Sequence, residues 1–154
     1  MEKLIRKLRQ DFSQFTFAEA AVASWSPERQ QISYKYEDTE VAAWTMLHEL
    51  GHALLQHRSF ASDIDLLQKE VAAWERARRI AGDYGIHIHD EHIQQCLDTY
   101  RDWLHKRSTC PTCRSQGLQP STSLYRCPNC QTSWKVSASR FCRPYRLRTA
   151  DAAT

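Results

Sequence analysis

The segment His48-Glu49-Leu50-Gly51-His52 constrains the fold more than any other feature of the sequence. In an α-helix, residues four apart lie one turn apart on the same face, so both imidazoles can bind one metal ion. Glu49 lies beside them and can reach a water on that metal without binding the metal itself. Such a pattern recurs by chance in roughly one chain in a few hundred of this length. Its meaning therefore depends on the residues around it.

These surroundings predict an amphipathic helix from about residue 40 to residue 57. With Glu40 at 0° on a helical wheel, His48, Glu49 and His52 lie between about 80° and 180°. The apolar side of the wheel holds Ala43, Met46, Leu47, Leu50 and Leu54. One face should therefore pack into a core while the other presents the motif to a cleft; the alternative is a simple solvated face. His57 falls on the apolar side, which makes it a poor ligand.

A catalytic zinc ion needs a third protein ligand and one open position. The candidates are Asp63, Asp65, Glu70, Glu75, His87 and His89. Glu70 lies at the centre of the apolar stripe of a helix predicted over residues 63–84, whereas Glu75 lies on its charged side. A buried carboxylate is costly unless a cation neutralises it, and either zinc or an arginine would do so. We predict Glu70 as the third ligand.

Two C-x-x-C pairs, Cys110-Pro-Thr-Cys113 and Cys127-Pro-Asn-Cys130, stand thirteen residues apart. Two tight turns with this separation can bring four thiolates to one tetrahedral zinc ion. The segment is too short for a core of its own, so the metal would supply much of its folding free energy. We therefore predict a structural zinc site in a zinc ribbon, with iron as the chemical alternative.

Charge is distributed unevenly along the 154 residues. Residues 1–105 hold 12 basic and 17 acidic side chains, whereas residues 106–150 hold nine basic side chains and no acidic one. Basic residues alternate with aromatic ones near the C-terminus, around Tyr125 and Trp134, a pattern suited to phosphate contacts and base stacking. The predicted contacts with DNA or RNA are Lys135, Arg140, Arg143, Arg146 and Arg148. The alternative is a solvated tail kept soluble by its charge.

Composition is that of a soluble globular protein, with 42% hydrophobic and 25% charged residues. No stretch approaches the roughly 18 apolar residues of a membrane span. The first residues are charged throughout and lack the apolar core of a signal peptide. We therefore expect a cytoplasmic protein without a membrane partner, and in a reducing cytosol paired cysteines are metal ligands rather than disulfides.

The stretch from His48 to Leu55, followed by Glu70-Val-Ala-Ala-Trp74, resembles the ImmA/IrrE type of zincin-like metallopeptidase over roughly residues 31–81. The resemblance implies His48, His52 and Glu70 as ligands of a catalytic zinc ion and Glu49 as general base. It also implies cleavage of regulatory proteins, often DNA-binding repressors. A zincin followed by a zinc ribbon is similar in layout to the SprT/Spartan group, which cleaves proteins crosslinked to DNA and uses a third histidine ligand.

The sequence thus predicts an α+β fold, mainly helical with a small sheet. Helices are expected over residues 2–17, 40–57, 63–84 and 90–106, and a strand over residues 31–36. The expected domains are a zincin-like metallopeptidase domain over residues 1–107, a zinc ribbon over residues 108–137 and a flexible basic tail over residues 138–154.

The expected function is that of a zinc-dependent endopeptidase acting on a protein substrate, either DNA-bound or regulatory. Glu49 would assist the attack of a zinc-bound water, and the chain would hold two zinc ions, one catalytic and one structural. The alternative is a non-enzymatic nucleic-acid-binding protein that uses the ribbon and the basic tail.

A peptidase also needs a group that stabilises the tetrahedral oxyanion. Residues after the second long helix can supply it: Tyr84, His87, His89, His92 and Tyr100. The strand predicted over residues 31–36 is either a sheet edge that pairs with an extended substrate or an ordinary core strand.

Overall fold

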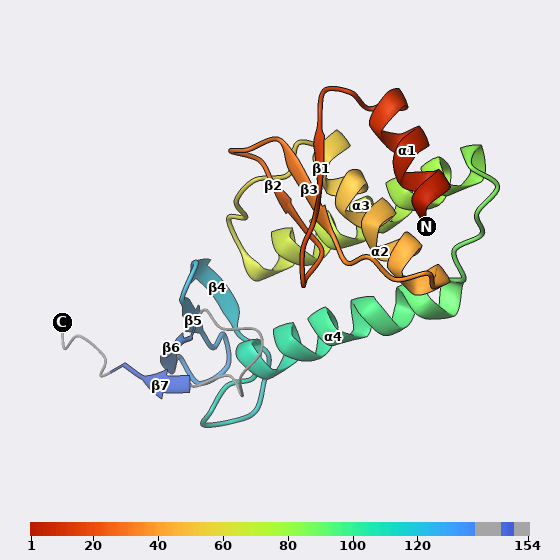
Figure 1. Ribbon diagram of the computed structural model, residues 1–154. Coiled ribbons are helices and arrows are strands. Elements are labelled where there is room, and N and C mark those ends of the chain that lie inside the picture. Colours follow the sequence, from red (N-terminus) through yellow and green to blue (C-terminus); the bar gives the residue numbers. More distant parts are fainter. Residues whose placement is uncertain (138–145, 150–154) are drawn as a thin grey trace. The chain divides into compact units, whose positions relative to one another are not determined.

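The computed structural model describes residues 1–137 and 146–149 (Figure 1). In chain order its elements are α1 (Glu2–Asp11), β1 (Thr16–Glu19), β2 (Ser24–Ser26), β3 (Gln31–Tyr34), α2 (Glu40–Leu54), α3 (Asp63–Asp83), α4 (Asp90–Ser108), β4 (Leu118–Ser121), β5 (Leu124–Arg126), β6 (Ser133–Val136) and β7 (Arg146–Arg148). The combination of helices with two small sheets is an α+β fold, as the sequence predicts.

The chain divides into two compact units. The first comprises residues 1–59 and 68–94, and the second comprises residues 60–67 and 95–154. The chain passes from one unit to the other three times, after Ser59, within α3 and within α4, so each unit is built from two separate stretches. The domain limits expected at residues 107 and 137 stay predictions.

In the first unit a three-stranded sheet has the order β1–β3–β2. β3 pairs in parallel with β1 and antiparallel with β2. Ile32, Ser33 and Tyr34 are all buried, so both faces of β3 are covered. The predicted strand therefore exists, but it is the central strand and ends at Tyr34. The edge position that the sequence analysis considered for it belongs to β1 and β2 instead.

The first helix is shorter than the sequence predicts. α1 ends at Asp11, and the chain then enters β1, where Phe17 is buried. Phe15, which continues the helical spacing of the apolar residues, packs edge-on against Trp25 of β2 with 5.4 Å between ring centroids. A few apolar residues at helical spacing do not distinguish a helix from the approach to a short buried strand.

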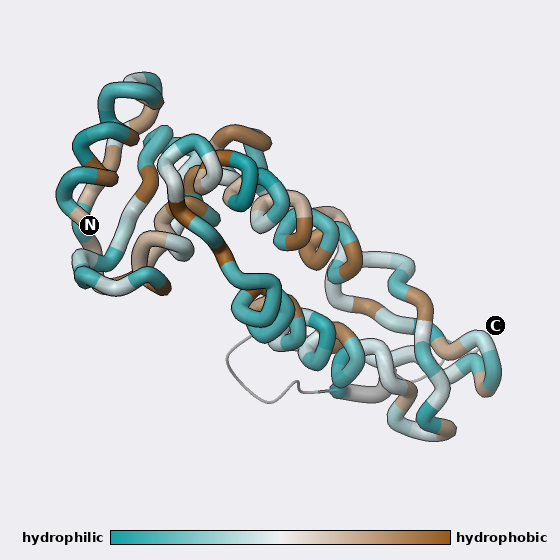
Figure 2. The backbone as a smooth tube through the Cα atoms, turned by 90° about the vertical axis from the view of Figure 1, so that its right-hand side faces the viewer, coloured by the Kyte–Doolittle hydropathy of each residue, from teal (hydrophilic) through white to brown (hydrophobic). Residues whose placement is uncertain are grey.

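The two central helices of the first unit touch backbone to backbone. A Cβ added at Gly51 of α2 would overlap the carbonyl oxygen of Ala73 in α3. On α3 the contact stripe consists of small side chains, and Ala73, Ala77 and Ala81 are fully buried. Figure 2 shows how hydrophobic residues recur at intervals along the long helices. Because Glu70 lies one turn before Ala73, the close approach at Gly51 brings it next to the histidine motif.

In the second unit four antiparallel strands form a sheet of order β4–β5–β6–β7. Its core consists of Cys110, Tyr125, Cys127, Trp134 and Val136. The rings of Tyr125 and Trp134 stack with 5.6 Å between centroids and 13° between planes. β7 lies within the segment that the sequence analysis assigned to the tail.

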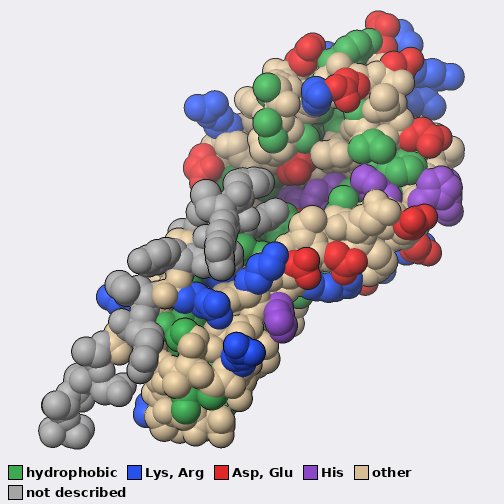
Figure 3. Space-filling view, turned by 90° about the horizontal axis from the view of Figure 1, so that it is seen from below, with side chains coloured by type: hydrophobic (Ala, Val, Ile, Leu, Met, Phe, Trp, Pro, Cys, Tyr) green, Lys and Arg blue, Asp and Glu red, His purple; other side chains and the backbone are tan. Residues whose placement is uncertain are grey.

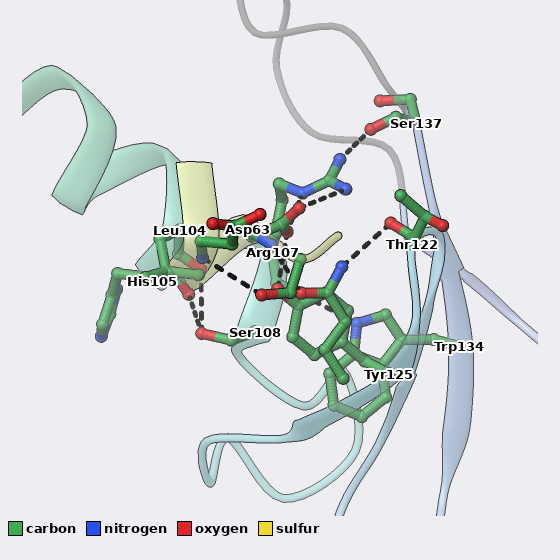
Figure 4. A network of polar contacts seen from close by, with 12 residues as sticks. Asp63, Leu104, His105, Arg107, Ser108, Thr122, Tyr125, Trp134 and Ser137 are labelled. Carbon is green, nitrogen blue, oxygen red and sulfur yellow. Dashed lines mark hydrogen bonds and ion pairs between the residues drawn. The ribbon is translucent and has the colours of Figure 1, made fainter. Parts of the chain in front are cut away.

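A buried ion pair joins the two stretches of the second unit (Figure 4). Arg107 Nε lies 2.6 Å from Asp63 Oδ2, and the side chains are 3% and 1% exposed. The hydroxyl of Tyr125 donates to the same carboxylate at 2.6 Å. Arg107 also donates to the carbonyl of Ser137, and its own carbonyl accepts from Trp134 Nε1 at 2.9 Å. The network fixes the start of α3 and the end of α4 to the four-stranded sheet.

Gly51→Ala is expected to lower the free energy of unfolding by about 1–3 kcal/mol, because the new methyl group meets the α3 backbone rather than a flexible side chain. Gly82→Ala is the matched control within α3, since nothing lies within 4 Å of the added Cβ. Replacing this helical glycine should raise the free energy of unfolding by about 0.5 kcal/mol. Urea unfolding measures both, and equal effects would contradict the packing argument.

Arg107→Leu is expected to lower the free energy of unfolding by about 3–5 kcal/mol, because it leaves the buried Asp63 carboxylate without its cation. Arg101→Leu is the control: Arg101 pairs with Asp98 at 2.7 Å on the surface, with side chains 45% and 64% exposed. Removing such a pair should change the stability by about 0.5 kcal/mol or less. Urea unfolding at one fixed zinc concentration compares them, and a loss of similar size in both would refute the role of the buried pair.

Candidate metal centres

Three side chains of the first unit bring one potential ligand atom each to a common point. His48 Nε2 lies 3.0 Å from His52 Nε2. Glu70 Oε2 lies 3.2 Å from His48 Nε2 and 3.7 Å from His52 Nε2. Ligands at tetrahedral positions about 2.0–2.1 Å from a zinc ion are about 3.3 Å apart. The three atoms therefore have the separation that a shared ion requires, and the group can hold a metal.

The surroundings of the three side chains are largely dry. The side chains of His48 and Glu70 are each 8% exposed, and that of His52 is 13% exposed. Trp74, one turn after Glu70 on α3, stacks its ring on His48 at 4.2 Å. Among the described residues, Glu70 has His48 and His52 as ion-pair partners and no lysine or arginine. The arginine salt bridge that the sequence left open is therefore not what neutralises this carboxylate.

The electrostatics of Glu70 suit a cation site. Burial alone would raise the pKa of Glu70, but hydrogen bonds with His48 and His52, together with their charge, outweigh it and hold the pKa far below the ordinary value. A carboxylate that stays ionised beside two imidazoles is a donor set that zinc takes in hydrolases. The chemistry of the residues present thus fits the metal that the sequence predicts.

Glu49 is half-buried beside these ligands. Burial raises the pKa of Glu49; the charges of His48 and His52 oppose the rise, and the negative charge of Glu70 adds to it. A hydrogen bond from the backbone of Trp25 also reaches the Glu49 carboxylate and favours its ionised form. A carboxyl group with a raised pKa is suited to accepting and returning a proton near neutral pH.

β2 contacts this centre, although no pattern in the sequence predicts a strand there. The backbone of Trp25 contacts Glu49, and its indole Nε1 donates to the carbonyl of His57 at 2.8 Å. β2 is only three residues long and carries a single apolar residue, so no alternation was visible. The edge strand beside the motif is therefore β2 and not the segment 31–36.

His57 does not lie where helical spacing places it. α2 ends at Leu54 rather than at His57, so His57 is not part of the helix and does not lie on its apolar side. Instead, His57 Nδ1 lies 2.9 Å from His52 Nδ1. The sequence analysis missed this contact, because neither Leu55 nor Gln56 is a recognised helix stop signal.

Of the six candidates for the third ligand, the structure brings Glu70 to the histidine pair. Asp63 is held in the buried ion pair with Arg107. Asp65 Oδ2 accepts a hydrogen bond from the backbone N–H of Ala61 at 2.8 Å. The other three side chains are exposed: Glu75, His87 and His89.

Six of the seven histidines belong to the first unit, and Figure 3 shows several histidine side chains gathered on one face.

Among the residues considered for oxyanion stabilisation, Tyr84 donates to Asp11 Oδ2 at 2.6 Å. Tyr100 belongs to the second unit. The ring of His92 contacts Trp74, which stacks on His48. Burial and the charge of His48 lower the pKa of His92.

Four cysteines of the second unit form a second group that can hold a metal: Cys110, Cys113, Cys127 and Cys130. Cys110 Sγ lies 3.6 Å from Cys130 Sγ, and Cys113 Sγ lies 3.5 Å from Cys127 Sγ. Sulfur ligands at tetrahedral positions about 2.3 Å from zinc are about 3.8 Å apart, close to these separations. The geometry matches the predicted four-cysteine site.

Hydrogen bonding divides the protons unequally among these thiols. Hydrogen bonds from the backbone and side chain of Ser115 lower the pKa of Cys113 to about 5. A backbone hydrogen bond from Cys130 favours the Cys127 thiolate, yet desolvation and the thiol contacts with Cys113 and Cys130 raise the pKa of Cys127 to about 11. A bound metal would favour the thiolate form of both cysteines.

The residues predicted to contact nucleic acid lie in different environments. Lys135 on β6 is exposed, and the exposed Arg146 on β7 donates to the carbonyl of Thr109 at 2.6 Å. Arg148 belongs to β7, whereas Arg140 and Arg143 lie outside the described residues. Tyr125 and Trp134 are core residues, 2% and 0% exposed, so the expectation that they stack on bases is wrong.

Comparison with protein-family models, with curated proteins and with solved structures finds no match to this chain. No helix within residues 1–137 and 146–149 is long and apolar enough to cross a bilayer.

Glu70→Gln is expected to remove metal from the first centre and leave the four-cysteine centre loaded, because a neutral amide is a poor replacement for a buried ionised ligand. Glu75→Gln on the exposed side of the same helix is the matched control and should leave both centres unchanged. Cobalt substitution distinguishes the centres, because only the cysteine site gives thiolate charge-transfer absorption. Unchanged metal content in the Glu70 variant would contradict the assignment.

Proposed function

We propose that the chain is a zinc-dependent endopeptidase of the zincin type that cleaves a protein substrate. The observation that carries the proposal is the convergence of His48, His52 and Glu70, whose ligand atoms lie 3.0 to 3.7 Å apart. When bound, zinc polarises a carbonyl and lowers the pKa of a coordinated water. The four-cysteine centre has all its positions filled by protein and would be structural.

The residues of the first unit have distinct roles in this proposal. The two histidines and Glu70 hold the ion, and the Trp74 ring limits access of water to one side of His48. Glu49 takes a proton from the attacking water and returns it to the leaving amine. Its raised pKa supports this role, because a carboxyl of ordinary acidity holds a proton poorly near neutral pH.

The substrate proposed is an extended polypeptide. β2 lies at the edge of the sheet and its central residue contacts Glu49, so a chain that added to this edge would run past the general base. We include in the proposal the ImmA/IrrE type of zincin, a cytoplasmic location, and a substrate that is regulatory or bound to DNA, as in the SprT/Spartan layout. The motif residues and the ribbon support this choice.

A second candidate is a nucleic-acid-binding protein without catalytic activity. It is favoured by the exposed basic side chains of the second unit, namely Arg114, Arg126, Lys135 and Arg146. Since the ribbon aromatics are buried, such binding would rest on phosphate contacts and show a steep salt dependence. Metal content separates the candidates: two zinc ions per chain favour the peptidase, and one favours the binding protein.

Glu49→Gln is expected to lower proteolysis by about 10²- to 10⁴-fold, because the amide cannot accept the proton. The zinc content should remain that of the parent protein, since Glu49 is not a ligand. Cleavage of an unfolded protein such as reduced casein, followed on gels, provides the assay, with metal content measured by mass spectrometry. Glu75→Gln should cleave normally. Undiminished cleavage by the Glu49 variant would refute this role.

A further inference from the structure

The C-terminal end of α2 has a specific hydrogen-bonding pattern. Leu55 is its C-cap residue, and Gln56 follows with a left-handed φ of 54°. The N–H of Gln56 donates to the carbonyl of Ala53 at 3.1 Å, and the N–H of His57 donates to the carbonyl of His52 at 3.0 Å. These two bonds define a Schellman motif.

This motif places residue 57 against residue 52. The contact between these two positions is usually hydrophobic. Here two imidazoles occupy them, with Nδ1 atoms 2.9 Å apart and ring centroids 5.0 Å apart. The carbonyl of His57 also accepts from Trp25 Nε1 at 2.8 Å, so the backbone at this position is held from both α2 and β2.

The left-handed residue of this motif is unusual. α3 ends in the same pattern, with Ile86 N–H donating to Ala81, and there the left-handed residue is Gly85, with φ of 68°. At the end of α2 the same conformation is adopted by Gln56, against its steric preference. Backbone conformations of this kind persist where the surrounding contacts enforce them, and they cluster at functional sites.

We infer that His57 is a positioning residue, which fixes the tautomer and ring orientation of His52 for metal binding. A neutral imidazole carries one proton, so a hydrogen bond donated by His52 Nδ1 to His57 Nδ1 leaves the lone pair on His52 Nε2. That atom is the one which lies 3.0 Å from His48 Nε2. Partners of this kind orient ligand histidines in metal sites generally. This inference rests on the proposed function.

The two ligand histidines differ in this support. His48 Nδ1 is buried and has no hydrogen-bond partner in the described part of the chain. His48 is instead held by the stacked ring of Trp74. Of the two histidines, His52 is therefore the one whose Nδ1 is held by a hydrogen bond with a neighbouring side chain. His57 is not itself a ligand, because it contacts the nitrogen of His52 that points away from the other ligand atoms.

The test uses the full chain and three substitutions at position 57. His57→Asn retains a side-chain oxygen that can accept the proton of His52, whereas His57→Phe retains the ring and loses the acceptor. His57→Ala loses both. Zinc affinity of the first centre, measured by competition with a chelating indicator, should fall about 10- to 100-fold in the Phe and Ala variants. The Asn variant should stay within about threefold of the parent protein.

Two internal controls accompany these measurements. The exposed His105 lies in the second unit, and His105→Ala should leave zinc affinity unchanged. Circular dichroism and urea unfolding show whether the first unit is folded in each variant, and loading of the four-cysteine centre shows the same for the second unit. Nitrogen-15 NMR of the imidazoles, recorded with the first centre free of zinc, gives a readout that needs no turnover: His52 should be protonated at Nδ1 alone in the parent protein, whereas the Phe variant should contain a mixture of tautomers.

The inference would be overturned if the zinc affinity of the first centre depended on the volume of the side chain at position 57 rather than on its hydrogen-bond acceptor. This would be the case if the Phe variant bound zinc as tightly as the parent protein, or if the Asn variant bound it as weakly as the Phe variant. An unchanged His52 tautomer in the Phe variant would also overturn the inference. In both cases the parent protein still binds zinc at His48, His52 and Glu70, and the proposed peptidase is unaffected. A parent protein that binds no zinc at these residues would instead overturn the proposed function and this inference together.

Discussion

Contact between the backbones of α2 and α3 at Gly51 is the constraint on which the first centre depends. The two histidines and Glu70 lie on different helices, so an ion can bridge them only where these two helices pack against each other. Gly51 stands between the two histidines of the motif and faces Ala73 directly. The absence of a side chain at Gly51 thus lets α3 approach closely enough to bring Glu70 to the two histidines.

The other contacts of the first centre follow from local structure along α2 and the turn after it. Helical spacing aligns His48 with His52, and a helix stop carries His57 back to His52. The two centres differ in how they relate to their cores. The first lies beside a core made of apolar residues from helices and sheet, whereas Cys110 and Cys127 are themselves core residues of the ribbon, packed with Trp134. Metal loss should therefore disturb the ribbon more than the histidine centre.

Sequence periodicity predicted the elements that a long amphipathic pattern or a definite stop signal marks. α2 begins after Thr39, whose side-chain oxygen accepts from the N–H of Ala42, and α3 ends at Asp83, two residues before Gly85. Glu70 stood out because a carboxylate in an apolar stripe needs a cation. The end of α2 was missed, because Gln56 gives no signal for a left-handed turn. Trp134 was misinterpreted since a ribbon with so small a core buries the aromatic residues that a larger domain could expose.

The discontinuous build of the second unit limits how the protein can be dissected. Asp63 opens the helix that later provides Glu70, yet its charge is balanced by Arg107 and its carboxylate is bonded by Tyr125 of the ribbon. Cutting the chain after α4 would strip Asp63 of the Tyr125 hydroxyl and expose one side of the pair. The sheet that follows α4 therefore cannot be removed without disturbing the start of the helix that bears Glu70.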